Sequence, residues 1–138
     1  MESIIIICIF VLLVAWKIWI SSPKNIGKYG EIRVARKLDW LSKEYITLND
    51  VLLPIHYGTT QIDHIVVSPY GIFVIETKNY KGWIFGHENS EDWKQSLVGK
   101  KTFWGWSSEQ HKLKNPIRQN SAHVRAVKAI LKELGVLQ

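Results

Sequence analysis

The sequence predicts an α/β domain in which β-strands lie between two amphipathic helices, preceded by an apolar N-terminal helix. Three observations support this fold class. Residues 61–78 contain two apolar, β-branched runs around a Ser-Pro-Tyr-Gly turn, which is typical of a β-hairpin. Apolar residues recur at helical spacing in residues 27–45 and 116–134. Residues 4–20 are apolar apart from one lysine. The 138-residue chain has room for one such domain.

The apolar N-terminal run, residues 4–20, is predicted to be a single-pass membrane anchor. A helix of this length measures about 25 Å at 1.5 Å per residue, close to the roughly 30 Å of a bilayer's hydrocarbon core. Lys17 can reach the interface, and Trp16 and Trp19 suit it. Basic residues then follow the run: Lys24, Lys28, Arg33, Arg36 and Lys37. The positive-inside rule therefore predicts a cell-membrane protein whose C-terminal domain is cytoplasmic.

Two other interpretations of the apolar run remain. A cleaved signal peptide is less favoured, because Glu2 replaces a basic residue and no small-x-small cleavage site follows Ile20. A buried helix of the domain would also be apolar on all sides. The favoured division is an anchor at residues 1–22 and a folded domain at residues 23–138.

The composition points to a polyanionic partner. The net charge is +6 and the pI is about 9.5, which favours nucleic acid or an anionic membrane surface, although many small basic proteins bind neither. The one cysteine, Cys8, excludes a disulfide framework or a cysteine-based zinc site within the chain.

After a short linker at residues 21–23, residues 27–45 are predicted to be the first amphipathic helix. Its apolar stripe is Val34, Ala35, Leu38, Leu41 and Tyr45. Glu31 lies on this stripe, where a carboxylate needs a partner. The alternative is that Glu31 only complements the helix dipole in the first turn.

Further strands are predicted at residues 46–54, at 83–85 and around Trp93, with turns at residues 58–60 and 99–101. Residues 102–106 follow the second of these turns. Asn115 and Pro116 form a strong helix start, the helix runs to about Leu134, and Gly135 is its expected C-cap. Gln119 falls in the first turn of this helix, where its side chain can reach toward the end of the sheet.

Tryptophans and lysines alternate in the region between the hairpin and the last helix. Trp83, Trp93, Trp104 and Trp106 could stack on bases, while neighbouring cations meet phosphates. The slightly favoured alternative is that these tryptophans cover one face of the sheet. The predicted nucleic-acid-binding residues are Lys81, Lys94, Lys100, Lys101, Lys112, Lys114 and Arg118.

The hairpin at residues 61–78 is the centre of the predicted site. If Pro69 and Tyr70 form the turn, Asp63 faces Glu76, with Cβ atoms about 4.5–5.5 Å apart. Carboxylates at that distance repel unless one is protonated or a cation lies between them. Lys78 lies on the same strand face as Glu76. A register slip of one residue would separate the two acids, and it remains an alternative because proline disfavours the usual hairpin turns.

These residue types suit metal-dependent phosphodiester hydrolysis. Two carboxylates can hold Mg²⁺, which prefers oxygen ligands and keeps several waters. The ion polarises a phosphate and lowers the pKa of a bound water. A nearby lysine can hold that water or offset charge that develops on the phosphate.

Four blocks of sequence resemble the NERD (nuclease-related) domain, which is similar to the PD-(D/E)XK, restriction-endonuclease-like nucleases. They are Gly30-Glu31, QIDHIVVS at residues 61–68, GIFVIETKN at residues 71–79 and NPIRQN at residues 115–120. The resemblance covers residues 27–134. It implies an α-β-β-β-α core with a mixed sheet flanked by helices, and a further strand after the second helix that residues 135–138 are too short to supply fully.

The resemblance also implies a bound Mg²⁺ or Mn²⁺ and a role for each matching residue. Asp63 and Glu76 would be the metal ligands and Lys78 the catalytic lysine. Glu31 would be the acidic residue of the first helix, and Gln119 the polar residue of the second. His64 is expected to be structural, because it lies on the strand face opposite Asp63.

The sequence therefore predicts a membrane-anchored, metal-dependent nuclease acting on DNA more readily than on RNA. The main alternative is a non-catalytic nucleic-acid-binding or membrane-organising module on the same fold, since fold does not fix function. A small structural membrane protein is a third, weaker alternative.

Overall fold

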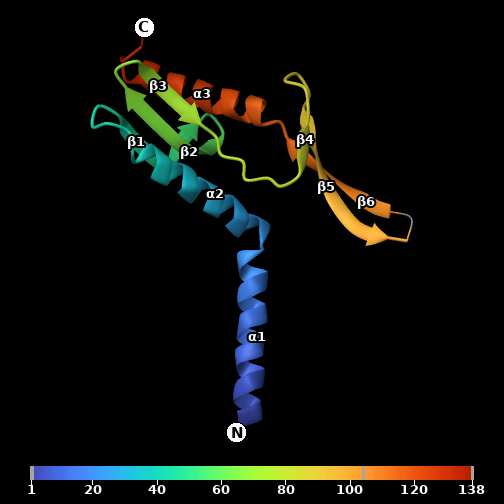
Figure 1. Ribbon diagram of the computed structural model, residues 1–138. Coiled ribbons are helices and arrows are strands. Elements are labelled where there is room, and N and C mark those ends of the chain that lie inside the picture. The colour runs from blue at the N-terminus through green and yellow to red at the C-terminus, as the bar shows by residue number, and fades with distance from the viewer. Residues whose placement is uncertain (1, 104, 138) are drawn as a thin grey trace.

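The computed structural model describes residues 2–103 and 105–137, without the side chains of residues 2–4, 100 and 102. This part of the chain forms three helices and two three-stranded sheets (Figure 1). The elements in order are α1 (Glu2–Ile20), α2 (Pro23–Leu38), β1 (Ile46–Ile55), β2 (Gly58–Ser68), β3 (Gly71–Ile75), β4 (Trp83–Phe85), β5 (Asp92–Thr102), β6 (Gly105–Lys114) and α3 (Pro116–Glu133).

The predicted order of one helix, three strands and a second helix is confirmed, with β4–β6 inserted before α3. The expectation of a mixed sheet is wrong for the described residues, because all their strand pairs are antiparallel. Short connections explain this result: a two-residue turn can return the chain only antiparallel, whereas parallel pairing needs a long crossover.

Helix α1 extends away from the rest of the molecule as a separate rod (Figure 1). All of its residues from Ile5 to Ile20 are exposed. Within the described part of the chain, no helix meets the length and hydropathy criteria for a membrane span by itself. Helices α1 and α2 meet them only jointly, across a bend of 65°. The membrane anchor therefore stays a prediction.

Helix α2 begins and ends earlier than the predicted range of residues 27–45. The Ser22 side chain caps it by accepting a hydrogen bond from the backbone N–H of Asn25 at 3.3 Å, and Pro23 occupies the first turn. The helix ends at Leu38, and residues 39–45 form turns and a short connection. Leu41 is consequently exposed rather than part of a buried stripe.

The predicted hairpin register is confirmed in β2 and β3. Ser68 pairs with Gly71 and His64 pairs with Ile75. The Ser68 hydroxyl fixes the turn, since it accepts from the Tyr70 N–H at 3.2 Å and donates to the Gly71 carbonyl at 3.0 Å. The same register places Glu76, the first residue after β3, opposite Asp63. The turn expected at residues 58–60 is wrong, because β2 starts at Gly58.

The second sheet, β4–β6, differs most from expectation. β4 is where it was predicted, but residues 99–101 lie inside the 11-residue strand β5, at a shift in register between Val98 and Lys101, rather than in a turn. β6 was not predicted. Its residues are mostly polar and nearly all exposed, so they lack the alternation that marks a half-buried strand. Figure 1 shows β5 and β6 as an arm projecting from the domain.

The core lies between the first sheet and α3. Ile62, Ile65 and Val127 are buried together, and Leu131 packs against them. Helix α3 starts as predicted, since the Asn115 side-chain oxygen accepts from the Ile117 N–H at 2.9 Å. Figure 1 shows α3 along one side of this sheet and α2 along the other. The residues just after β3 contact both helices, through Glu76 to Gln119 of α3 and through Asn79 to Ile26 of α2.

Candidate active site

An interruption in the β1–β2 ladder turns Asp63 away from the core. Pairing is regular on both sides, but the pair formed by Asp50 and Asp63 is missing. Ile62 and Ile65 both pack in the core, so side-chain alternation fails between them. Asp63 and His64 accordingly line the same small cavity of about 90 Å³ beside α2. The expectation that His64 lies on the opposite face is wrong for this reason.

Asp50 marks the interruption and was not singled out from the sequence. Its φ of 56° lies in the left-handed region, which aspartate tolerates better than most residues. Its carboxylate accepts a hydrogen bond from the Gln61 amide and lies 3.5 Å from Lys28 Nζ. The hydrogen bond from Gln61, and then the charge of Lys28, lower the pKa of Asp50.

Lys28 also joins this strand to Glu31 on α2. Its Nζ lies 3.2 Å from Glu31 Oε2, and this contact raises the pKa of Lys28. Glu31 lines the small cavity together with Asp63 and His64. The predicted acidic residue of the first helix therefore has a partner and lies at the site.

His64 has the surroundings of a structural residue. It is buried, and its Nδ1 lies 2.7 Å from Asn49 Oδ1 on the neighbouring strand. Burial lowers the pKa of its imidazole, which favours the neutral ring. A neutral ring held by a neighbouring strand agrees with the structural role expected for it.

Glu76 is the most enclosed member of the site. Its side chain is 6% exposed. One carboxylate oxygen, Oε1, accepts from Lys78 Nζ at 2.5 Å and from Gln119 Nε2 at 2.6 Å. The other, Oε2, lies 3.1 Å from His123 Nε2. The end of β3 and the first two turns of α3 thus converge on one carboxylate.

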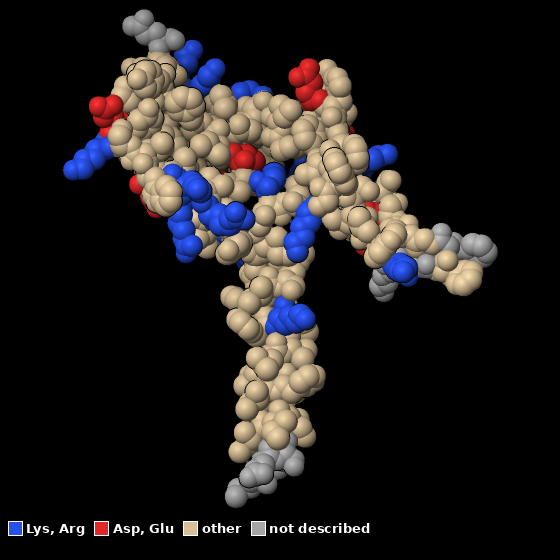
Figure 2. Space-filling model, viewed as in Figure 1, with Lys and Arg blue, Asp and Glu red and all other residues tan. Residues whose placement is uncertain are grey.

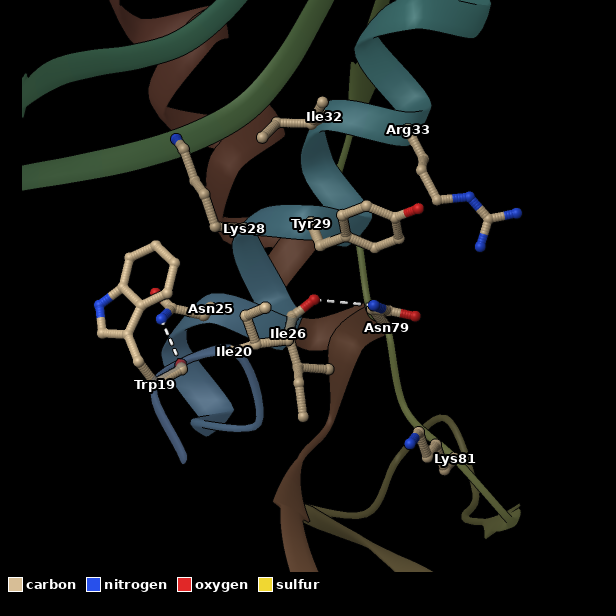
Figure 3. A pocket seen from close by; sticks show the side chains of 10 residues that line it. All are labelled: Trp19, Ile20, Asn25, Ile26, Lys28, Tyr29, Ile32, Arg33, Asn79 and Lys81. Atoms are coloured by element: carbon tan, nitrogen blue, oxygen red, sulfur yellow. Dashed lines mark hydrogen bonds between the residues drawn. The ribbon is translucent and has the colours of Figure 1, made fainter. Parts of the chain in front are cut away.

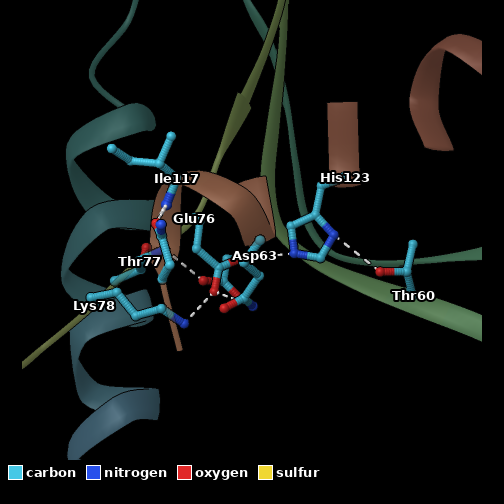
Figure 4. Close-up of polar contacts among 9 residues, drawn as sticks. Thr60, Asp63, Glu76, Thr77, Lys78, Ile117 and His123 are labelled. Atoms are coloured by element: carbon cyan, nitrogen blue, oxygen red, sulfur yellow. Dashed lines mark hydrogen bonds and ion pairs between the residues drawn. The ribbon is translucent and has the colours of Figure 1, made fainter. Parts of the chain in front are cut away.

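Asp63 and Glu76 lie side by side, with the Lys78 amine next to them (Figure 4). Asp63 Oδ2 accepts from the Thr77 N–H at 2.7 Å, which fixes its direction. Glu31, Asp63, Glu76 and Lys78 all line one cavity of about 630 Å³. Figure 2 shows acidic side chains in a hollow on this face, with lysines and arginines around them. The structure therefore brings together the predicted acids and lysine, and Gln119 joins them through Glu76.

His123 belongs to the same cluster but was not predicted. It is buried in α3, and its Nδ1 lies 3.0 Å from Thr60 Oγ1 (Figure 4). Residues four apart lie on the same helix face, so His123 follows Gln119 along the side that meets β3. A histidine four residues after the expected site glutamine was the signal available in the sequence.

Gly30 allows α2 to approach the site closely. A Cβ atom at this position would lie 2.6 Å from the Cβ of Asn79, which is closer than real side chains come. The Asn79 amide donates to the Ile26 carbonyl at 2.7 Å and ties the segment after Lys78 to α2. The close contact with Asn79 therefore explains why residue 30 is a glycine.

The donor set fits a hard divalent cation in part. Among the described residues, no group of three or more His, Cys, Asp or Glu is arranged to hold a metal ion. Two adjacent carboxylates remain, and Glu76 Oε2 is buried with no aligned hydrogen-bond donor in the described structure, despite its close contact with His123. Mg²⁺ takes oxygen ligands and keeps several waters, so Asp63 and Glu76 are a sufficient protein contribution.

The predicted nucleic-acid-binding residues are distributed rather than gathered at the cavity. Lys81 lines it. The strand register pairs Lys94 with Lys112 and Asp92 with Lys114, so these three lysines share one face of the arm. The opposite face contributes Gln95, Leu97 and His111 to the cavity.

The other predicted basic residues lie farther along these elements. Arg118 is exposed in the first turn of α3, and Lys101 is exposed beyond the register shift in β5. The side chain of Lys100 lies outside the described residues.

The tryptophans do not form one layer over the sheet. Trp83 is 72% exposed and Trp106 is 68% exposed. Trp93 instead packs over Gly86, and its ring N–H donates to the His87 carbonyl at 2.9 Å. Trp104 lies outside the described residues. Exposed aromatic rings on β4 and β6 are therefore available for contacts.

Comparison with known proteins gives two findings. The family model described as "Nuclease-related domain" matches residues 26–137. An uncharacterized protein of Bacillus anthracis is 42% identical over 113 residues, which are 80% of this chain and 49% of that protein. The chain thus spans about half the length of this curated relative. No solved structure matches the chain.

Proposed function

Because the chain belongs to the nuclease-related domain (NERD) family, we propose that it is a metal-dependent nuclease that hydrolyses phosphodiester bonds in DNA or RNA. One observation carries the proposal: Asp63, Glu76 and Lys78 line a single cavity, and the Lys78 amine lies next to both carboxylates (Figure 4). Two carboxylates and an amine at one point suit the hydrolysis of a phosphodiester.

Asp63 and Glu76 are the residues that would hold the ion. Bound Mg²⁺ or Mn²⁺ would polarise the phosphate and lower the pKa of an attacking water. Within the chain, the Thr77 N–H orients Asp63, and the Gln119 amide orients Glu76. Glu31 adds a third carboxylate to the cavity wall, where it can accept a hydrogen bond from a water molecule.

Lys78 can meet the substrate directly. Its side chain is 26% exposed, whereas that of Glu76 is 6% exposed, so the lysine is the more accessible member of the pair. In this position it offsets the negative charge that grows on the phosphate during attack and holds the attacking water. DNA is the favoured substrate, held mainly through phosphate contacts, so binding is expected to weaken steeply with salt.

The test is cleavage by the full chain, purified in detergent, of plasmid DNA and of RNA in Mg²⁺ or Mn²⁺ and in EDTA. Asp63→Asn and Lys78→Ala are each expected to lower cleavage by about 10²-fold or more, because each removes a group that acts on the developing charge. Lys43→Ala is the matched control, at an exposed position that does not line the cavity, and should cleave like the wild type. Equal cleavage by all four proteins contradicts the mechanism.

A second candidate is a non-catalytic nucleic-acid-binding module. It is favoured by the lack of a metal-binding group of three or more His, Cys, Asp or Glu among the described residues. Salt-sensitive binding of DNA, with no cleavage in either metal, would support this candidate over the nuclease.

The proposed location is the cell membrane, with α1 as a single-pass anchor and the domain in the cytoplasm. The support is the exposure of the apolar side chains of α1, from Ile5 to Ile20, and the basic residues that follow in α2. Such a helix leaves a large apolar surface that some apolar partner must cover.

A further inference from the structure

A second large cavity lies where α1 meets α2 (Figure 3). Its volume is about 610 Å³, similar to that of the active-site cavity. The end of α1, one side of α2 and the segment after β3 form its walls. None of the proposed catalytic or metal-binding residues lines it, although Lys81, one of the predicted nucleic-acid-binding residues, does.

The walls of this junction cavity combine an apolar part with a cationic part. Trp19 and Ile20 from α1, with Ile26 from α2, form the apolar part. Figure 3 shows Arg33 and Lys81 on the side away from Trp19. Within the described residues, Arg33 and Lys81 have no acidic partner. Two unneutralised cations beside an apolar wall suit an amphiphilic anion.

The position of the cavity indicates that this amphiphile is a membrane lipid. Helix α1 has 19 residues, which is about 28 Å at 1.5 Å per residue, and α2 leaves its end at a bend of 65°. If α1 lies in a bilayer, the junction lies at the level of the lipid headgroups. Trp19 and Tyr29 line the cavity there, and such aromatic residues are enriched at the membrane interface.

We propose that the junction cavity binds one anionic phospholipid, with its headgroup on the side of Arg33 and Lys81 and its acyl chains along Trp19 and Ile20. This inference rests on the proposed membrane anchoring of α1. A nucleic-acid strand also carries phosphates, but it has no aliphatic part to cover the isoleucines. Asn79 and Lys81 also line the active-site cavity, so the bound headgroup would border the catalytic site.

The experiment uses the full chain in an uncharged detergent and counts retained lipid by native mass spectrometry, after mixing with phosphatidylglycerol or phosphatidylcholine. The wild type is expected to retain phosphatidylglycerol at least about tenfold more than phosphatidylcholine. The double variant Arg33→Gln/Lys81→Gln should lose this preference. Arg33→Lys/Lys81→Arg should keep it, because the charges remain.

The matched control is Lys43→Gln/Lys132→Gln, which makes the same change in charge at exposed positions away from the cavity. It should retain lipid like the wild type. Equal retention of both lipids by the wild type overturns the proposal. So does a preference that survives Arg33→Gln/Lys81→Gln, or displacement of the lipid by a short oligonucleotide.

Failure of the underlying proposals is measured separately. Cleavage is assayed on the same preparations without added lipid, and an inactive chain that keeps its lipid preference contradicts only the nuclease. Partitioning of the chain into the aqueous phase of a detergent phase separation contradicts the anchoring. Loss of lipid preference in an active, detergent-phase chain contradicts only the junction site.

Discussion

At the scale of single residues, the environment of Glu76 decides whether the site can work. A buried carboxylate is costly unless other groups satisfy it. Lys78 and Gln119 share one of its oxygens, and His123 lies against the other. Only the second oxygen has no aligned donor in the described structure, although it lies 3.1 Å from His123 Nε2. The surroundings of Glu76 thus fix the direction of its carboxylate.

We expect His123 to act as a positioning residue for Glu76, in concert with Thr60. His123→Ala should lower the free energy of unfolding by about 1–3 kcal/mol, because it leaves buried polar groups unpaired. Thr60→Val should have a smaller effect, since it removes only the hydroxyl that holds the ring. Urea unfolding followed by circular dichroism measures both changes.

The double variant makes this prediction specific. Groups in one hydrogen-bonded chain are non-additive, so the combined loss should differ from the sum by about 0.5 kcal/mol or more. His111→Ala, at an exposed ion pair with Glu109, is the control and should change stability by less than about 0.5 kcal/mol. Additive losses at Thr60 and His123 would show that they do not act together.

The sequence predicts part of the site because short-range rules place its residues. A tight turn sets the hairpin register, and the register sets Asp63 against Glu76. His123 lies 47 residues after Glu76, and the only local signal for their contact is its spacing of four residues from Gln119. The face of His64 was mispredicted because the alternation rule assumes an unbroken ladder, which Asp50 interrupts.

At the scale of elements, the packing of α2 against the segment after β3 keeps Glu31 and Lys78 in the same site. Gly30 lies against Asn79, and the Asn79 amide is bonded to Ile26. This contact joins the helix that carries Glu31 to the residue that follows Lys78. Its closeness depends on the missing side chain at Gly30.

Gly30→Ala and Gly27→Ala are a matched pair that tests this contact. A Cβ atom at Gly30 would overlap Asn79, so we expect a loss of about 1–3 kcal/mol in stability. Gly27 has nothing within 4 Å of an added Cβ, so alanine there should stabilise α2 by up to about 1 kcal/mol. Urea unfolding of both variants gives the comparison. If both changes stabilise the protein equally, α2 does not pack as described.

Elements with strong end signals were predicted best. The Asn-Pro start of α3 specifies its first residue, because a capping side chain and a proline act locally. α2 was placed too late because Ser22 and Pro23, the same kind of signal, were interpreted as a linker. β6 could not be found from hydropathy, since it is exposed on both faces and its pairing with β5 depends on contacts across the arm.

At the scale of the whole molecule, an apolar rod leads into a basic domain from which an arm projects (Figures 1 and 2). The whole net charge of +6 belongs to the domain and arm, because residues 1–20 contain one acid and one base. Lys94, Lys112 and Lys114 face away from the catalytic cavity. We therefore expect a long nucleic acid to contact the arm at a distance from the point of cleavage.

The orientation in the membrane follows from the same distribution of charge. Alkaline phosphatase fused at the C-terminus of the chain should be inactive in bacteria, because the enzyme folds only outside the cytoplasm, and the basic residues after α1 should keep that end inside. A green fluorescent protein fusion at the same position should fluoresce. High phosphatase activity with a dark fluorescent fusion would reverse the proposed orientation.

The gap in the β1–β2 ladder has a consequence for motion. Paired amides in the middle of a strand normally exchange their hydrogens slowly, since they are released only by larger openings. The missing pair of Asp50 and Asp63 places a weakly protected point between two formed pairs, Asn49 with His64 and Val51 with Ile62. Deuterium uptake should therefore show a fast-exchanging amide within an otherwise slowly exchanging hairpin. The strand that carries Asp63 would then open locally at that residue while the rest of the sheet stays paired.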